Sequence, residues 1–170
     1  FQVNPAGGAH LVKRFMETVK RLEPSRVIDL YAGAGLFGCA AAACGVTDIL
    51  AVESDAAAAE AARFNLARRT ANARVAAGDA GDALKELGRE DAAHTLLIVD
   101  PPRNGLAFAA MQALTRSTLG QLVYVSCNPA TWTRDAIRLG KGGFRLRRLE
   151  LVNMFPRTEH FELFSEWVRD

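Results

Sequence analysis

Short apolar runs alternate with longer amphipathic stretches along the chain, and this alternation limits the possible folds more than any other feature of the sequence. The segments between the runs are rich in Ala, Leu and Arg and have helical character. Repeated strand-helix units of this kind build a parallel sheet that is covered by helices on both faces. We therefore expect an α/β fold whose parallel strands occupy residues 26–31, 48–53, 73–78, 95–100 and 122–126.

The two ends of the chain depart from this alternation. Apolar residues recur near helical spacing over about residues 8–22, and Pro24 follows, so we expect a helix before the first strand. After Gly142 the pattern alternates in the manner of strands over residues 144–155 and 161–168. We therefore expect the sheet to end in an antiparallel, hairpin-like pair.

Composition fits one globular domain over residues 1–170, since 49% of the residues are hydrophobic and 24% are charged. No window contains the ~18 apolar residues that a membrane-spanning helix needs. The three cysteines, Cys39, Cys44 and Cys127, lack the spacing of a metal site, which favours a reducing cytoplasm. A net charge of +2 permits contact with a polyanion without demanding it. Because the chain begins at Phe1 and not at a methionine, we expect a processed chain or a domain taken from a longer protein. We also expect a monomer.

A glycine-rich stretch, VIDLYAGAGLFG, covers the end of the first predicted strand and the residues after it. Its glycines, Gly33, Gly35 and Gly38, with Glu53 further along, formally match the fingerprint of dinucleotide-binding proteins, which receive a pyrophosphate there. Here, however, Asp29 lies at the strand end just before the glycines. A carboxylate suits a ligand that carries an ammonium group and no phosphate. The pattern therefore favours S-adenosylmethionine over a nicotinamide dinucleotide.

Acidic residues stand at the ends of three successive predicted strands. The loop from Asp29 to Gly35 suits the amino-acid end of S-adenosylmethionine, Glu53 suits its ribose diol, and Asp79 suits its adenine edge. Any one of these acids could instead be a helix cap. All of them would lie along the carboxyl edge of the sheet, where open α/β sheets bind their ligands.

Two later strand ends bring further reactive groups to the same edge. The fourth predicted strand ends in Asp100, followed by two prolines and Arg103. Methylases that act on amino groups often have an aromatic residue in place of this arginine, so the pattern argues against amino-group chemistry. The fifth strand ends just before Cys127. Most free cysteines are small buried hydrophobes, but a thiol directly after a strand end is a candidate nucleophile.

These stretches resemble the motifs of the RNA (uracil-5-)-methyltransferases, which carry FxQxN, DLYxGxG, DPPRxG, SCNPxTxxRD and FPxTxHxE in this order. The resemblance implies a Rossmann-like class I methyltransferase fold with a seven-stranded, mostly parallel sheet. It also implies S-adenosylmethionine as cofactor and carbon 5 of a uridine in tRNA or ribosomal RNA as target. The corresponding stretches, the first shifted by one position, are residues 1–4, 29–35, 100–105, 126–135 and 155–162.

The resemblance also implies roles for individual residues. Cys127 would add to carbon 6 of the uracil, and Glu162 would remove the proton from carbon 5, with His160 as the rival base. Arg134 would be an orienting residue, with a helix cap or a surface ion pair as the alternative for Arg134 and Asp135. The residues expected to bind the cofactor are Gln2, Asp29, Tyr31, Gly33, Gly35, Glu53, Asp79 and Asp100. The residues expected to contact the substrate are Asp100, Arg103 and Asn128.

Three alternatives remain open on the sequence. One is another class of methyltransferase, although enzymes that make 5-methylcytosine usually have a cysteine at the position of Arg103. The others are a non-catalytic RNA-binding module, against which the intact Cys127 and Glu162 argue, and an NAD oxidoreductase.

The chain departs from common family residues at three positions, and it lacks the family's upstream RNA-binding segment and iron-sulfur cysteines, so we expect no metal. The three positions are Leu36, Arg157 and Leu163.

Overall fold

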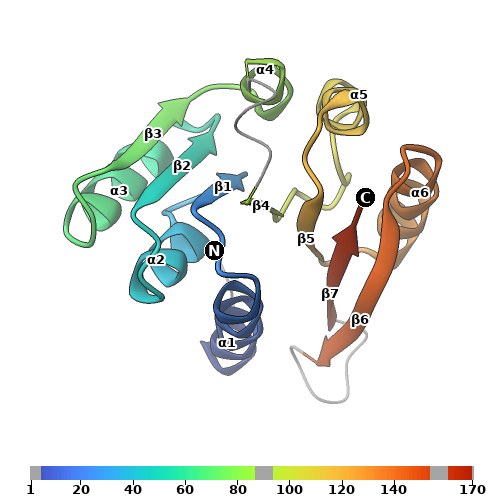
Figure 1. Ribbon diagram of the computed structural model, residues 1–170, viewed down its shortest axis with the longest axis horizontal. Helices are drawn as coiled ribbons and strands as arrows, with labels where there is room; N and C mark the ends of the chain where they lie inside the picture. The colour runs from blue at the N-terminus through green and yellow to red at the C-terminus, as the bar shows by residue number, and fades with distance from the viewer. Residues whose placement is uncertain (1–4, 87–93, 154–160, 170) are drawn as a thin grey trace.

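One seven-stranded sheet forms the centre of the molecule, with strand order β3-β2-β1-β4-β5-β7-β6 (Figure 1). The computed structural model describes residues 5–86, 94–153 and 161–169. The first five strands are parallel, and β7 runs antiparallel to both β5 and β6. The predicted parallel strands and the antiparallel final pair are therefore confirmed. The strands are β1 (Arg26–Leu30), β2 (Asp48–Glu53), β3 (Ala73–Ala77), β4 (Thr95–Val99), β5 (Gln121–Ser126), β6 (Arg145–Asn153) and β7 (Phe161–Val168).

Helices cover both faces of this sheet, as the alternating pattern predicts. One buried cluster packs α1 and α2 against one face, and a second cluster packs α4, α5 and α6 against the other. Successive residues of each central strand therefore contribute to opposite clusters, as in β4, where Leu96 and Leu97 do so. The helices are α1 (Pro5–Leu22), α2 (Leu36–Ala43), α3 (Ala56–Ala67), α4 (Ala80–Lys85), α5 (Phe108–Arg116) and α6 (Pro129–Lys141).

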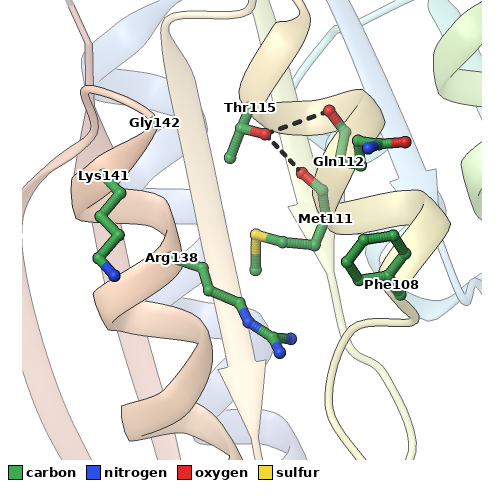
Figure 2. A pocket seen from close by; sticks show the side chains of 7 residues that line it. All are labelled: Phe108, Met111, Gln112, Thr115, Arg138, Lys141 and Gly142. Carbon is green, nitrogen blue, oxygen red and sulfur yellow. Dashed lines mark hydrogen bonds between the residues drawn. The ribbon is translucent and has the colours of Figure 1, made fainter.

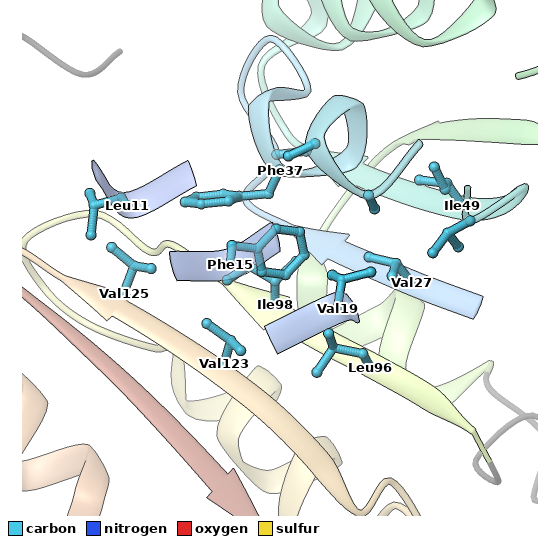
Figure 3. Close-up of a cluster of buried hydrophobic side chains, with 14 of the residues drawn as sticks. Leu11, Phe15, Val19, Val27, Phe37, Ile49, Leu96, Ile98, Val123 and Val125 are labelled. Carbon is cyan, nitrogen blue, oxygen red and sulfur yellow. The ribbon is translucent and has the colours of Figure 1, made fainter. Parts of the chain in front are cut away.

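The helix α1 lies against the sheet through one apolar stripe. Leu11, Phe15 and Val19 are spaced four residues apart, so they share one face of the helix, and all three are buried. Figure 3 shows them against side chains of the central strands and against Phe37 of α2. The rings of Phe15 and Phe37 meet edge to face, with centroids 5.3 Å apart. This packing fixes the start of α1 beside the loop that follows β1.

Three helices begin at the carboxyl edge of the sheet with a side-chain cap. Asp55 precedes α3 and accepts from the amide of Ala58, and Asp79 precedes α4 and accepts from the amides of Gly81 and Asp82. In the same way, the carboxamide oxygen of Asn128 accepts from the amide of Ala130 at the start of α6. Such caps satisfy amide groups that have no partner within the helix. No helix among the described residues is long and apolar enough to cross a membrane.

Candidate active site

The carboxyl edge of the sheet gathers the ends of β1, β2, β4 and β5 with the beginning of β7. β7 is antiparallel to β5, so Phe161 and Glu162 start at the edge where β5 ends. Ser126 is paired with Leu163 across these two strands. Cys127 and Glu162 each lie one residue beyond that pair, on the same side of it. The strand register therefore places the thiol and the carboxylate next to each other.

A cavity of about 920 Å³ opens at this edge beside the loop that follows β1. Its volume is about twice that of another cavity among the described residues, of about 460 Å³ at the end of α1. Its walls come from the start of α1, the β1 loop, the start of α2, the end of β2, the last turns of α3 and the end of β4. The lining residues are Gly8, Ala9, Val12, Tyr31, Ala32, Gly33, Ala34, Gly35, Leu36, Phe37, Cys39, Glu53, Ser54, Asn65, Arg69, Asp100 and Pro102.

The loop after β1 has a backbone shape that suits glycine. Tyr31, Gly33 and Gly35 all have positive φ angles, of 61°, 53° and 84°. A Cβ atom on Gly33 would meet no atom within 4 Å, so the left-handed backbone is what calls for glycine at this position. The amide of Gly33 donates to Oε2 of Glu53 over 2.9 Å. The carboxylate at the end of β2 therefore holds the glycine loop against the cavity.

Glu53 is half-buried and reaches the cavity from the end of β2. Its Oε1 accepts from the amide of Asp55 over 2.8 Å and from the hydroxyl of Ser54 over 3.3 Å, while its Oε2 accepts from the amide of Gly33. A carboxylate offers about four lone-pair sites, two on each oxygen, so Oε2 keeps capacity for a ligand hydroxyl. The geometry is compatible with the predicted contact to a ribose diol.

Asp29 is fully buried beneath the glycine loop and does not line the cavity. Its Oδ2 accepts from the amide of Gly38 over 2.8 Å, and its Oδ1 has no hydrogen-bond partner among the described residues. Burial is the main cause that raises the pKa of this carboxyl to about 7; the charges of Asp100 and Glu53 act in the same direction and the hydrogen bond from the Gly38 amide opposes them. Asp29 thus supports the start of α2 from below, and its direct contact with a cofactor stays a prediction.

The remaining predicted cofactor residues divide into three cases. Tyr31 and Asp100 line the cavity, and burial raises the pKa of the Tyr31 hydroxyl. Asp79 caps α4 and is not among the lining residues. Gln2 lies outside the described residues.

The first turns of α6 hold the loop that follows β4. The carbonyl oxygen of Arg103 accepts from Nδ2 of Asn128 over 3.0 Å and from Oγ1 of Thr131 over 3.1 Å. The carbonyl oxygen of Asn104 accepts from Nη2 of Arg134 over 2.9 Å. The predicted orienting residues Asn128 and Arg134 therefore bond to the backbone of the loop that carries Arg103, whose own side chain is exposed.

Asp135 stands behind these contacts and is completely buried. Its Oδ2 accepts from the amide of Leu106 over 2.8 Å and from the hydroxyl of Tyr124 over 2.9 Å. Its Oδ1 accepts from Nε of Arg134 over 2.9 Å. One carboxylate thus ties β5, α6 and the β4 loop together. Sequence reasoning did not separate this role from that of a surface ion pair.

Burial and neighbouring charges shift the pKa values of Cys127, at the end of β5, and of Glu162, at the start of β7. Burial raises the pKa of the Cys127 thiol above its ordinary value, the charge of Glu162 adds to this, and Arg103 opposes it. Burial also raises the pKa of Glu162 to about 7, with a further contribution from the charge of Asp100. Oε2 of Glu162 has no hydrogen-bond partner among the described residues. His160, the rival base, lies outside them.

Several lining residues were not predicted. Gly8, Ala9 and Val12 reach the cavity because α1 packs over the β1 loop, and a long-range contact of this kind leaves no local signal in the sequence. Asn65 of α3 donates through Nδ2 to the carbonyl of Ala34 over 2.9 Å. The one local signal in the sequence is its position in the helix that follows β2, twelve residues after Glu53.

Comparison with known proteins agrees with this architecture. The model of the family described as tRNA (uracil-5-)-methyltransferase matches residues 1–165. The chain is 36% identical over 165 residues to the 23S rRNA (uracil(1939)-C(5))-methyltransferase RlmD of Pseudomonas aeruginosa, covering 96% of this chain and 36% of that protein. It is 39% identical over 169 residues to RlmD of Chromohalobacter salexigens, covering 99% of this chain and 34% of that protein. The chain therefore spans about a third of the length of these curated relatives.

Solved structures give the same result for the fold. The crystal structure of the Pyrococcus abyssi tRNA (uracil-54, C5)-methyltransferase in complex with S-adenosyl-L-homocysteine is similar, with a TM-score of 0.84 and 33% identity over 99% of this chain and 40% of that chain. The putative methyltransferase yhhF of Escherichia coli shares the fold, with a TM-score of 0.71 and 20% identity over 95% of this chain and 86% of that chain. The family match over residues 1–165 shows that this chain belongs to the tRNA (uracil-5-)-methyltransferase family.

Proposed function

We propose that this chain transfers a methyl group from S-adenosylmethionine to carbon 5 of a uridine in tRNA or ribosomal RNA, through a covalent adduct with Cys127. The observation that carries the proposal is the strand register that places Cys127 beside Glu162, at the edge where the cavity opens. Membership of the uracil-5-methyltransferase family supports the same reaction.

The residues around the cavity fit this cofactor. A volume of about 920 Å³ is within the range of small-molecule sites. The glycine loop leaves open space above Gly33, and Glu53 and Asp100 bring carboxylates to the wall. We assign the amino-acid end of the cofactor to the loop from Tyr31 to Gly35 and the ribose to Glu53. When bound, S-adenosylmethionine supplies an electrophilic methyl group.

Cys127 would activate the target base. Carbon 5 of uracil is a poor nucleophile, and addition of a thiolate to carbon 6 converts it into a reactive enolate. The thiol resists ionisation in this site, because burial and the charge of Glu162 both raise its pKa, while Arg103 lowers it. Loss of the thiol proton is therefore easiest when Glu162 is protonated and Arg103 is close.

Glu162 would act after methylation. The proton on carbon 5 must leave before the Cys127 sulfur can be expelled, and a carboxylate with an ordinary pKa is a weak base for this. Burial raises the pKa of Glu162 to about 7, which brings it close to the pH at which the reaction would run. The carboxylate takes the proton, the carbon 6–sulfur bond breaks, and the electron pair returns to Cys127.

The order of these steps can be tested by trapping. Glu162→Gln should form the adduct and methylate carbon 5 but fail to eliminate, so a protein-RNA adduct should accumulate in denaturing electrophoresis when the methyl donor is present. Cys127→Ala should form no adduct, and Glu60→Gln, which changes an exposed glutamate of α3, should behave as the unmodified chain. Low salt strengthens phosphate contacts and helps the chain engage RNA. Normal methylation by Glu162→Gln without any adduct would remove Glu162 from the mechanism.

A further inference from the structure

Charge is distributed very unevenly along the chain. Eight Lys or Arg residues and a single acid, Asp135, lie between Pro101 and Leu149, although the whole chain has a net charge of only +2. Asp135 is 0% exposed and bonds to β5, α6 and the β4 loop. The only acidic group of this region is thus removed from the surface. The helices α5 and α6 therefore present positive charge without exposed carboxylates of their own.

A groove of about 410 Å³ lies between these two helices (Figure 2). Met111 is mostly buried and forms part of the floor, while Phe108, at the start of α5, is 72% exposed. Arg138 reaches from α6 toward the groove in Figure 2. Near Gly142 the helices touch, because a Cβ atom there would come within 2.5 Å of the Thr115 methyl group. The groove therefore has an apolar floor and an aromatic rim, and it is closed at the end where Gly142 and Thr115 meet.

The cations of the groove are not neutralised by their surroundings. Nη1 of Arg138 is 3.7 Å from Oδ1 of Asp135, but Arg134 approaches the same oxygen more closely, at 2.8 Å. One carboxylate cannot balance two guanidinium groups. Lys141 forms no ion pair with any residue in the described ranges. A polyanion that enters the groove would therefore meet uncompensated charge.

The two helices that form the groove begin near the candidate active site. α5 follows the loop that carries Arg103, and α6 begins at Pro129, two residues after Cys127. Both helices start at the carboxyl edge and run down the same face of the sheet (Figure 1). An RNA strand whose target base lies at Cys127 would reach the starts of α5 and α6 before the rest of the groove.

We propose that the α5–α6 groove, lined by Phe108, Met111, Arg138 and Lys141, binds a single-stranded segment of the substrate RNA that flanks the target uridine. An unstacked base lies on the ring of Phe108, and phosphates lie against Arg138 and Lys141. RNA fits this combination of an aromatic ring and cationic side chains better than an acidic protein does, because single-stranded RNA is recognised by stacking on aromatic rings together with contacts to phosphates. The inference rests on the proposed function, since it assigns part of the RNA to the same catalytic edge.

The test measures binding of a labelled single-stranded oligouridine by fluorescence anisotropy, at about 50 and 200 mM salt. Phe108→Ala should weaken binding about tenfold, the usual effect of losing one stacked base. The double change Arg138→Gln and Lys141→Gln should lower the slope of log affinity against log salt by about 1.4. Phe108 and Lys141 are exposed and Arg138 is half-buried at the surface, so the variants should keep the circular dichroism spectrum and the cofactor affinity of the unmodified chain.

Matched controls change the same residue types elsewhere. Phe64 of α3 is 64% exposed and serves as the aromatic control, and Lys20 with Arg63 removes the same total charge. Oligouridine binding that falls equally in the control and groove variants would overturn the proposal. Displacement of the RNA by polyglutamate, with no effect of Phe108→Ala, would replace the RNA groove with a surface for acidic proteins. If the groove variants behave as expected but Glu162→Gln yields no adduct, the groove stands and the proposed reaction fails.

Discussion

The buried carboxylate of Asp135 should be worth several kcal/mol to the folded state. Asp135→Ala leaves the amide of Leu106 and the hydroxyl of Tyr124 without an acceptor, in a site where Asp135 itself is 0% exposed. Each unsatisfied buried group costs about 1–3 kcal/mol. Arg134 also loses its closest carboxylate. We therefore expect the free energy of unfolding to fall by about 3–5 kcal/mol.

Urea unfolding followed by circular dichroism measures this loss. Asp135→Asn keeps one acceptor oxygen for the buried donors and should therefore cost about 1–2 kcal/mol less than the alanine change. It should still be destabilising, because hydrogen bonds to a charged group are the stronger ones. Thr133→Ala, on the exposed side of the same helix, should stay within about 0.5 kcal/mol of the unmodified chain. This control distinguishes the loss of the Asp135 hydrogen bonds from a general sensitivity of α6 to substitution.

A double-mutant cycle with Tyr124→Phe isolates the shared hydrogen bond. Tyr124→Phe alone should cost about 1.5–3 kcal/mol, because it removes a hydroxyl bonded to a carboxylate. In the Asp135→Ala background the same change removes an unsatisfied hydroxyl, so it should be neutral or stabilising. A coupling energy near zero, or a loss below about 1 kcal/mol for Asp135→Ala, would refute the view that this network is satisfied and buried.

Three further predictions concern the candidate site. Cys127→Ala should abolish methyl transfer to RNA in a tritium-transfer assay while cofactor affinity stays unchanged, whereas Cys44→Ala should keep both. Glu53→Ala should weaken cofactor binding by about 1.5–3 kcal/mol in calorimetry; unchanged affinity would place the ribose elsewhere. Because burial raises the pKa of Glu162 to about 7, the folded chain binds this proton more tightly than the unfolded chain does, so stability falls as pH rises from about 4.5 to about 7. Glu162→Gln should remove that part of the slope in urea titrations.

The strands were readable from the sequence because burial on both faces produces short, continuous apolar runs. The run at residues 95–100 corresponds to β4, whose five residues are all buried. The start of the first helix was less accurate, since it was expected near Gly8 and the structure has α1 from Pro5. Proline is tolerated in the first turn of a helix, where its missing amide has no partner. Glycines at the start of the segment hid this extension, because glycine is a poor helix former.

The sequence predicted the strand ends more accurately than it predicted where the side chains at those ends would lie. Asp29, Glu53 and Asp79 all follow the same sequence pattern, yet Asp29 is buried beneath the loop, Glu53 lines the cavity and Asp79 caps α4. The depth of each side chain depends on how α1 and α2 pack over the loop, which is a long-range property. Sequence spacing predicts which edge a residue reaches, whereas packing decides whether it faces a ligand or supports the backbone.

Asp100 connects the two halves of the proposed reaction. It lies at the end of β4, between the cavity and the Cys127–Glu162 pair, because β4 is bonded to both β1 and β5. Its negative charge contributes to the raised pKa of Glu162 and of Cys127. Asp100 would therefore feel a cationic methyl donor directly, and partial neutralisation of its charge would lower the pKa of both groups. On this reasoning, cofactor binding would favour the thiolate that attacks carbon 6, and the loss of the positive charge on methyl transfer would restore the raised pKa of Glu162 before it accepts the proton from carbon 5.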